Sequence, residues 1–86
     1  MAMKITLKLY ATLSEHLPPG AFQNAAQINV ANDVTLNQVI DEYHVPRELA
    51  HLVLINGFFA CEEDRDLPGK LNEGDTLAIW PPVAGG

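Results

Sequence analysis

The sequence predicts an α+β fold in which one main helix lies across one face of a mixed β-sheet. Three observations support this prediction: segments in which polar and apolar residues alternate, one segment with helical spacing of its apolar residues, and a length of 86 residues. A chain this short has room for one hydrophobic core, so we expect a single domain. It has little room for a deep enzymatic cavity of its own.

Alternation of polar and apolar residues indicates the first two strands. Residues 4–9 (Lys-Ile-Thr-Leu-Lys-Leu) alternate strictly, which predicts a strand with one buried and one solvated face. Residues 17–27 begin with Leu-Pro-Pro-Gly and are predicted to form a loop. Residues 27–30 alternate again, so we expect them to return as the hairpin partner of the first strand.

The helix is predicted between Val34 and Tyr43. Thr35 and Gln38 have the spacing of a capping box, and Val34 and Val39 that of a hydrophobic staple. Four apolar residues then share one helical stripe that faces the core: Leu36, Val39, Ile40 and Tyr43. Three polar residues are expected to face solvent: Asn37, Asp41 and Glu42.

Three further strands are predicted in the second half of the chain. Pro46 ends the helix, with at most one short turn up to residue 50. Residues 52–55 and 58–61 are apolar throughout and flank the turn dipeptide Asn56-Gly57, which predicts a hairpin. Polar and apolar residues alternate over residues 76–80, which predicts the last strand. If this last strand is central in the sheet, it lies beside the first strand. This order predicts a ubiquitin-like β-grasp domain over residues 1–80.

Composition and charge exclude several classes of function. Eleven Asp and Glu against five Lys and Arg give a net charge of −6, which argues against binding to nucleic acid or to an anionic membrane. No apolar run approaches the ~20 residues of a membrane span, and the N-terminus does not resemble a secretion signal. One cysteine permits no internal disulfide. We therefore expect a cytoplasmic protein that is monomeric when alone.

No metal or nucleophilic site is predicted. His16, His44 and His51 share no ligand spacing, so we expect no bound metal. Cys61 follows three apolar residues and is expected to pack as a small hydrophobe rather than to accept sulfur. The acidic residues 62–64 are expected to form a solvated turn rather than a guide for a basic partner.

Residues 81–86 (Pro-Pro-Val-Ala-Gly-Gly) are predicted to form an extended C-terminal tail. The two prolines favour a stiff polyproline base, and six residues reach at most about 20 Å, far enough to enter a partner's cleft. Gly85 and Gly86 lack Cβ atoms, so they fit a narrow tunnel and leave the glycyl carbonyl open to attack. The chain carries no phosphate-binding loop or catalytic triad, so another enzyme has to activate the terminal carboxylate.

Three segments carry a resemblance to a known family. They are residues 53–57 (Val-Leu-Ile-Asn-Gly), residues 71–79 (Leu-x-x-Gly-Asp-x-Leu-Ala-Ile) and residues 80–86 (Trp-Pro-Pro-Val-Ala-Gly-Gly). Together they resemble the sulfur-carrier family that includes the small subunit of molybdopterin synthase and the carrier of thiazole synthesis. The Pro-Pro-Val run resembles the molybdopterin branch more than the thiazole branch.

The resemblance implies a sulfur carrier that binds no cofactor itself. An adenylating enzyme of the ubiquitin-activating type would join AMP from ATP to the Gly86 carboxylate, and a sulfur donor enzyme would displace AMP to leave a thiocarboxylate. The loaded tail would then enter the large subunit of molybdopterin synthase. Gly85 would leave space around the reacting group, and Pro81 and Pro82 would set the direction in which the tail leaves the domain. Val83 and Ala84 complete the tail. Two other classes stay open: a protein modifier joined to lysines through Gly86, and a non-covalent interaction module.

A second candidate site lies on the sheet. If Leu77 and Ile79 face the helix, Trp80 falls on the opposite face, and a strand apolar at every position must also place Leu52 and Leu54 there. As an exposed patch, these side chains would dock the activating enzyme and the synthase subunit. The alternative is that loops, or the aliphatic stems of the first strand, cover them.

Overall fold

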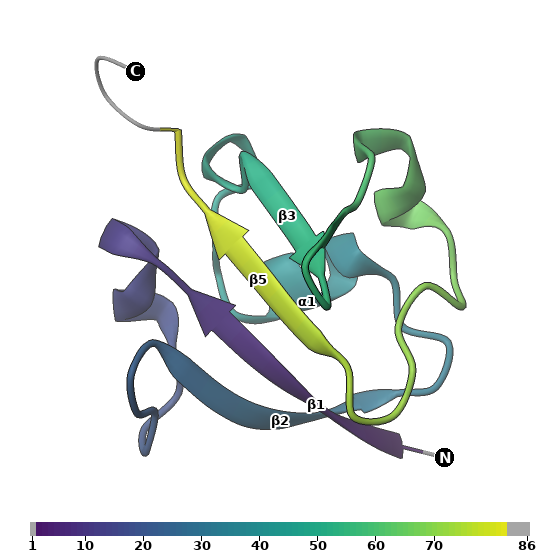
Figure 1. Cartoon of the computed structure of the whole chain (residues 1–86), viewed down its shortest axis with the longest axis horizontal. Helices are drawn as coiled ribbons and strands as arrows, with labels where there is room; N and C mark the ends of the chain where they lie inside the picture. The colour runs from purple at the N-terminus through teal and green to yellow at the C-terminus, as the bar shows by residue number, and fades with distance from the viewer. Residues whose placement is uncertain (1, 83–86) are drawn as a thin grey trace.

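The computed structural model describes residues 2–82, which form a five-stranded mixed sheet with one α-helix across one face (Figure 1). The first strand, β1 (Ala2–Leu9), pairs antiparallel with β2 (Ala25–Ala31) and parallel with the last strand, β5 (Thr76–Trp80). On its other side β5 pairs antiparallel with β3 (Leu52–Ile55). The predicted mixed sheet is confirmed, with the last strand at its centre.

The second hairpin forms at the predicted Asn-Gly turn. Leu54 pairs with Phe59 and Ile55 with Phe58, which leaves a two-residue loop and gives the sheet the order β2-β1-β5-β3-β4. Asn56 and Gly57 have φ angles of 52° and 87°, and positive values at both positions are those of a type I′ turn. β4 (Phe58–Phe59) is shorter than the predicted 58–61, because the chain leaves the sheet edge there to begin a helical turn.

One core fills the space between the sheet and α1 (Leu36–Glu42). Alternate residues of β1 face it, as the sequence pattern predicts, and the outward residues between them are exposed or half-buried. The largest fully buried side chains come from β1, from η1 (Ala11–His16), from α1 and from the strands β3 and β5: Ile5, Leu7, Leu9, Leu13, Leu36, Val39, Ile40, Val53, Leu77 and Ile79.

The helix begins at the predicted capping box. The backbone N–H of Gln38 donates to Thr35 Oγ1 at 3.1 Å, and the backbone N–H of Thr35 donates to Gln38 Oε1 at 2.8 Å. The prediction that Asn37 faces solvent is wrong. Asn37 is 9% exposed, and its Nδ2 donates to Asp66 Oδ1 at 2.9 Å. Asp66 ends η3 (Glu62–Asp66), which packs against this side of α1 and covers a position that helical periodicity assigns to solvent.

The connections contain 3-10 helices, of which only one was expected. The turn predicted after Pro46 contains η2 (Arg47–Leu49), whereas η1 and η3 lie in segments that carry no helical pattern. β2 begins at residue 25 rather than 27, because Phe22 and Ala25 exchange both backbone hydrogen bonds, at 2.8 and 3.0 Å, around a tight turn. No helix within residues 2–82 has the length and apolar character to span a membrane.

Replacing Thr35 with Ala should lower the free energy of unfolding by about 1 kcal/mol, because the Gln38 N–H loses its acceptor at the start of the helix. Urea unfolding followed by circular dichroism measures the change. Thr35→Ser, which keeps the hydroxyl, is the matched control and should remain close to the parent protein. Equal losses in both variants would show that the cap hydrogen bond is not the cause.

Candidate functional site at the end of the central strand

The central strand carries the chain to one end of the sheet, where the base of the predicted tail begins (Figure 1). Trp80 is the last residue of β5, and its carbonyl accepts a hydrogen bond from the His51 N–H at 3.0 Å. Pro81 and Pro82 have no N–H to donate, so the ladder of strand hydrogen bonds ends here. Pro81 is half-buried and Pro82 is exposed. The other predicted tail residues lie outside the described residues: Val83, Ala84, Gly85 and Gly86.

The three predicted docking residues lie together on the sheet face opposite α1. Leu52 pairs with Trp80 and Leu54 with Ala78, and directly opposed residues of neighbouring strands share a face. Trp80 and Leu54 are half-buried, and Leu52 is 37% exposed. We call this surface the outer face and define it by the following residues: Lys4, Thr6, Lys8, Tyr10, Leu52, Leu54, Phe59, Thr76, Ala78 and Trp80.

Tyr10 covers part of Trp80. The two rings are parallel within 1°, and their centroids lie 4.3 Å apart, a stack that contributes about 0.5–1.5 kcal/mol beyond the area it buries. The Tyr10 N–H donates to the Ile79 carbonyl at 3.2 Å, which holds Tyr10 beside the end of β5. The cover expected from aliphatic stems or loops is therefore supplied by this aromatic ring. The alternation in the sequence already indicated that Tyr10 lies on this face, because it continues the outward positions of Lys4, Thr6 and Lys8.

The outer face carries Lys4 and Lys8, the two cations near the surface that have no acidic partner among the described residues; the buried Arg65 bonds carbonyls instead. Arg47 pairs with Asp41, with 2.6 Å between Nη2 and Oδ2, and its hydrogen bonds hold the pKa of the Asp41 carboxyl below its ordinary value. The Lys70 ammonium lies 3.8 Å from Asp64 Oδ2. In the described part of the chain, Lys4 and Lys8 make no ion pair. A shallow hollow of about 470 Å³ opens beside Lys8, Leu54 and Trp80.

A buried arginine anchors the backbone next to the tail. Arg65 is 6% exposed; its Nη1 donates to the Ala50 carbonyl at 2.8 Å and its Nη2 to the His51 carbonyl at 3.4 Å, while its Nε has no hydrogen-bond partner. The His51 N–H in turn bonds the Trp80 carbonyl. The guanidinium thus connects η3 to the last residue of β5 through residue 51. The sequence did not indicate this role, because Arg65 lies in a polar segment typical of a solvated turn.

Two further predictions concern cysteine and metal binding. The prediction that Cys61 packs as a small hydrophobe is wrong, because β4 ends at Phe59 and Cys61 is exposed where the chain turns outward into η3. Over residues 2–82, the structure contains no group of three His, Cys, Asp or Glu residues that could hold a metal ion. His16 lies 3.7 Å from Glu15, and no carboxylate pairs with His44 or His51 among these residues.

No protein-family model matches the chain, and no curated protein matches its sequence. Solved structures do match. The solution structure of the Haloferax volcanii HVO 2177 protein has a TM-score of 0.74 at 26% identity, covering 99% of this chain and 88% of that chain. The crystal structure of SAMP1, a small archaeal modifier protein from the same organism, has a TM-score of 0.63 at 26% identity, covering 96% and 99%. The chain is a ubiquitin-like β-grasp protein.

The same fold occurs in a complex. In the complex of subunits 1 and 2 of the molybdopterin-converting factor from Helicobacter pylori, one chain matches this β-grasp protein with a TM-score of 0.57 at 20% identity. The match covers 98% of this chain and 100% of that chain. At this identity the likeness shows the fold alone.

Replacing Arg65 with Met should lower the free energy of unfolding by about 1–3 kcal/mol, because the buried Ala50 carbonyl and the partly buried His51 carbonyl lose their donor. The His51 amide should also exchange its hydrogen faster, since the backbone that holds it to Trp80 is no longer anchored. Urea unfolding and hydrogen exchange followed by NMR measure the two effects. Arg47→Met removes an exposed ion pair and is the matched control, with an expected change of at most about 1 kcal/mol. Unchanged His51 protection in Arg65→Met would contradict the anchoring role.

Proposed function

We propose that this β-grasp protein is a sulfur carrier that is loaded at the carboxylate of Gly86. The observation that carries the proposal is the central strand, which is hydrogen-bonded on both sides and ends at the Trp80-Pro81-Pro82 step. Only three residues separate this step from Gly86, and the last of them is Gly85. A rigid body with a short, slender tail is suited to presenting a carboxylate to the active site of another enzyme.

The proposed chemistry takes place at the tail and is catalysed by partners. A Gly86 carboxylate oxygen attacks the α-phosphorus of ATP in an adenylating enzyme, and pyrophosphate leaves. The outer sulfur of a persulfide on a donor enzyme then attacks the glycyl carbonyl carbon of the acyl adenylate, and AMP leaves with the oxygen. A second thiol of the donor enzyme cleaves the S–S bond of the resulting acyl disulfide, which leaves a thiocarboxylate on Gly86 and a disulfide on the donor. The β-grasp protein is a co-substrate in these steps and binds no cofactor of its own.

The proposed recipient is the large subunit of molybdopterin synthase, with this chain as the small subunit. The run of Trp80 into Pro-Pro-Val and the shared fold with a molybdopterin-converting-factor complex support this choice. A second candidate is a protein modifier joined through Gly86 to lysines of its targets. The 26% identity to SAMP1, a modifier by name, favours this candidate. Sulfur delivery to another pathway, such as thiazole synthesis, uses the same loading chemistry.

The outer face is the proposed docking surface for the activating enzyme and for the large subunit. Leu52, Leu54 and Trp80 give it an apolar centre directly beside the base of the tail. Lys4 and Lys8 lie along the neighbouring strand without acidic partners in the described part of the chain, so a partner with carboxylates opposite β1 would fit best.

Incubation with the activating enzyme, ATP and a sulfur donor should raise the intact mass by about 16 Da, because sulfur replaces one oxygen of the carboxylate. A chain lacking Gly85 and Gly86 is the control and should gain no mass while it remains folded. Covalent adducts with other proteins, in place of the mass gain, would support the modifier instead. No change in mass under several conditions would exclude both covalent functions.

Replacing Trp80 with Ala should weaken binding to the activating enzyme about tenfold or more, because it removes the largest side chain of the outer face. Lys8→Glu leaves the core untouched and should also weaken binding, by reversing a charge on the same face. Isothermal titration calorimetry measures both. Phe22→Ala, at a 74% exposed position before β2, is the control for loss of an aromatic residue elsewhere. Affinity that is unchanged in both Trp80→Ala and Lys8→Glu would exclude the outer face as the docking surface.

A further inference from the structure

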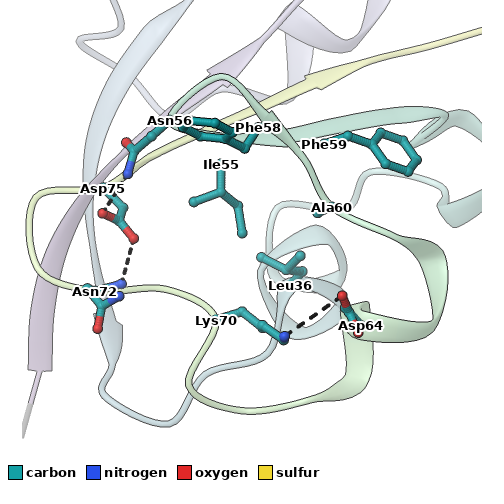
Figure 2. A pocket seen from close by; sticks show the side chains of 10 residues that line it. All are labelled: Leu36, Ile55, Asn56, Phe58, Phe59, Ala60, Asp64, Lys70, Asn72 and Asp75. Atoms are coloured by element: carbon teal, nitrogen blue, oxygen red, sulfur yellow. Dashed lines mark hydrogen bonds and ion pairs between the residues drawn. The ribbon is translucent and has the colours of Figure 1, made fainter.

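A pocket of about 380 Å³ opens between the β3–β4 hairpin and the segment 64–75 (Figure 2). Leu36 of α1 and Ile55 of β3 project into its centre, and Ala60 lies beside them. These three side chains form an apolar floor. Phe58, which pairs with Ile55, lies along the hairpin side of the pocket and is 77% exposed, whereas the ring of Phe59, which pairs with Leu54, points away from the pocket (Figure 2).

Hydrogen bonds fix one wall of the pocket. Asn56 Nδ2 donates to Asp75 Oδ1 at 2.9 Å, and the backbone N–H of Asn72 donates to Asp75 Oδ2 at 2.8 Å (Figure 2). The backbone N–H of Thr76 donates to Asn56 Oδ1 at 2.9 Å, so the hairpin turn is bonded directly to the start of β5. Because this wall is already ordered, a ligand need not order it on binding, and that lowers the entropic cost of association.

The opposite wall is acidic. Asp64 lines it and lies 3.8 Å from Lys70, the one cation that lines the described pocket. Glu62 and Glu63 precede Asp64 in η3; both are exposed, and neither makes an ion pair among the described residues. The apolar floor is therefore bordered by more negative than positive charge, and a cationic ligand complements it.

We propose that this pocket binds a short segment of a partner protein in which apolar side chains are flanked by Lys or Arg. The apolar side chains occupy the space over Leu36 and Ile55 and bury the exposed ring of Phe58. The flanking cations are attracted by the exposed carboxylates of Glu62 and Glu63, which directly precede Asp64 of the pocket wall. The pocket volume of about 380 Å³ accommodates a few side chains of such a segment.

This site and the tail lie at opposite ends of the central strand. Asp75 directly precedes the first residue of β5, whereas Pro81 directly follows the last one. The pocket floor also lies on the α1 side of the sheet, away from the outer face. A segment bound over Leu36 and Ile55 leaves Trp80 and Pro81, at the far end of β5, uncovered. The inference therefore does not rest on the proposed sulfur chemistry, and its failure would leave that proposal unaffected.

The test is an NMR titration of the isotope-labelled full chain with an amidated peptide that has a central Leu-Phe pair and two Lys residues on each side. We expect a dissociation constant on the order of 0.1 mM, with shift changes centred on Leu36, Ile55, Phe58 and Ala60. A peptide with Glu in place of every Lys, and one with Ser-Ser in place of Leu-Phe, should each bind at least about tenfold more weakly. Raising the salt concentration should weaken binding of the Lys peptide.

Matched variants distinguish binding at the pocket from non-specific binding of the peptide elsewhere on the surface. Phe58→Ser should weaken binding about tenfold, whereas Phe22→Ser, at a position of nearly equal exposure (74% against 77%), should leave it unchanged. Glu62→Lys combined with Glu63→Lys changes only exposed side chains and should weaken binding about fivefold. The proposal is overturned by equal binding of the Lys and Glu peptides, by shift changes centred on the outer face, or by no shift changes at millimolar peptide.

Discussion

The structure depends on the position of β5 between β1 and β3. A parallel partner on one side and an antiparallel partner on the other satisfy its backbone and leave neither of its edges open. At one end the His51 and Tyr10 amides bond the carbonyls of Trp80 and Ile79, and at the other end the Thr6 amide bonds the carbonyl of Asp75. The side chains of the same strand alternate between the core and the outer face. A five-residue segment thus supports the core, the outer face and the base of the tail together.

The charges of this acidic protein are divided between its two candidate interaction surfaces. Of the five Lys and Arg residues, one is buried, two pair with aspartates, and Lys4 and Lys8 project from the outer face. The pocket beside η3 has the opposite sign, because Glu62, Glu63 and Asp64 follow one another there. A partner surface of one charge sign is therefore attracted to one of these surfaces and repelled by the other. The division would favour two different partners over two copies of one.

Local patterns in the sequence were sufficient for most of the fold. The alternation in β1, the capping box of Thr35 and Gln38, and the Asn56-Gly57 turn each depend on residues close together in the chain, and each has its predicted conformation. The sequence placed the last strand beside the first only on the condition that it is central, and the sheet order meets that condition. The base of the tail at Pro81 and Pro82 was located from a local pattern, because a proline pair cannot continue a ladder.

The burial of Asn37 and the roles of Arg65 and Tyr10 depend on contacts between segments far apart in the sequence. Asn37 is buried because η3, nearly thirty residues later, covers it, and helical periodicity describes packing against one layer only. The role of Arg65 depends on carbonyls that lie 14 and 15 residues earlier, which no pattern in its own polar segment indicates. Tyr10 continues the outward positions of β1 in the sequence, but its stack on Trp80 also requires the parallel pairing of β1 with β5.

The stack of Tyr10 on Trp80 also gives the protein an intrinsic optical reporter. Trp80 is the only tryptophan in the chain, so its fluorescence comes from one place, the last residue of the central strand. A neighbouring tyrosine in parallel contact modulates that emission, and a molecule that covers the outer face or separates the two rings changes it directly. A ligand in the pocket beside Phe58, at the other end of β5, leaves the indole in its present surroundings. One unlabelled fluorescence signal therefore distinguishes events at the two ends of the molecule.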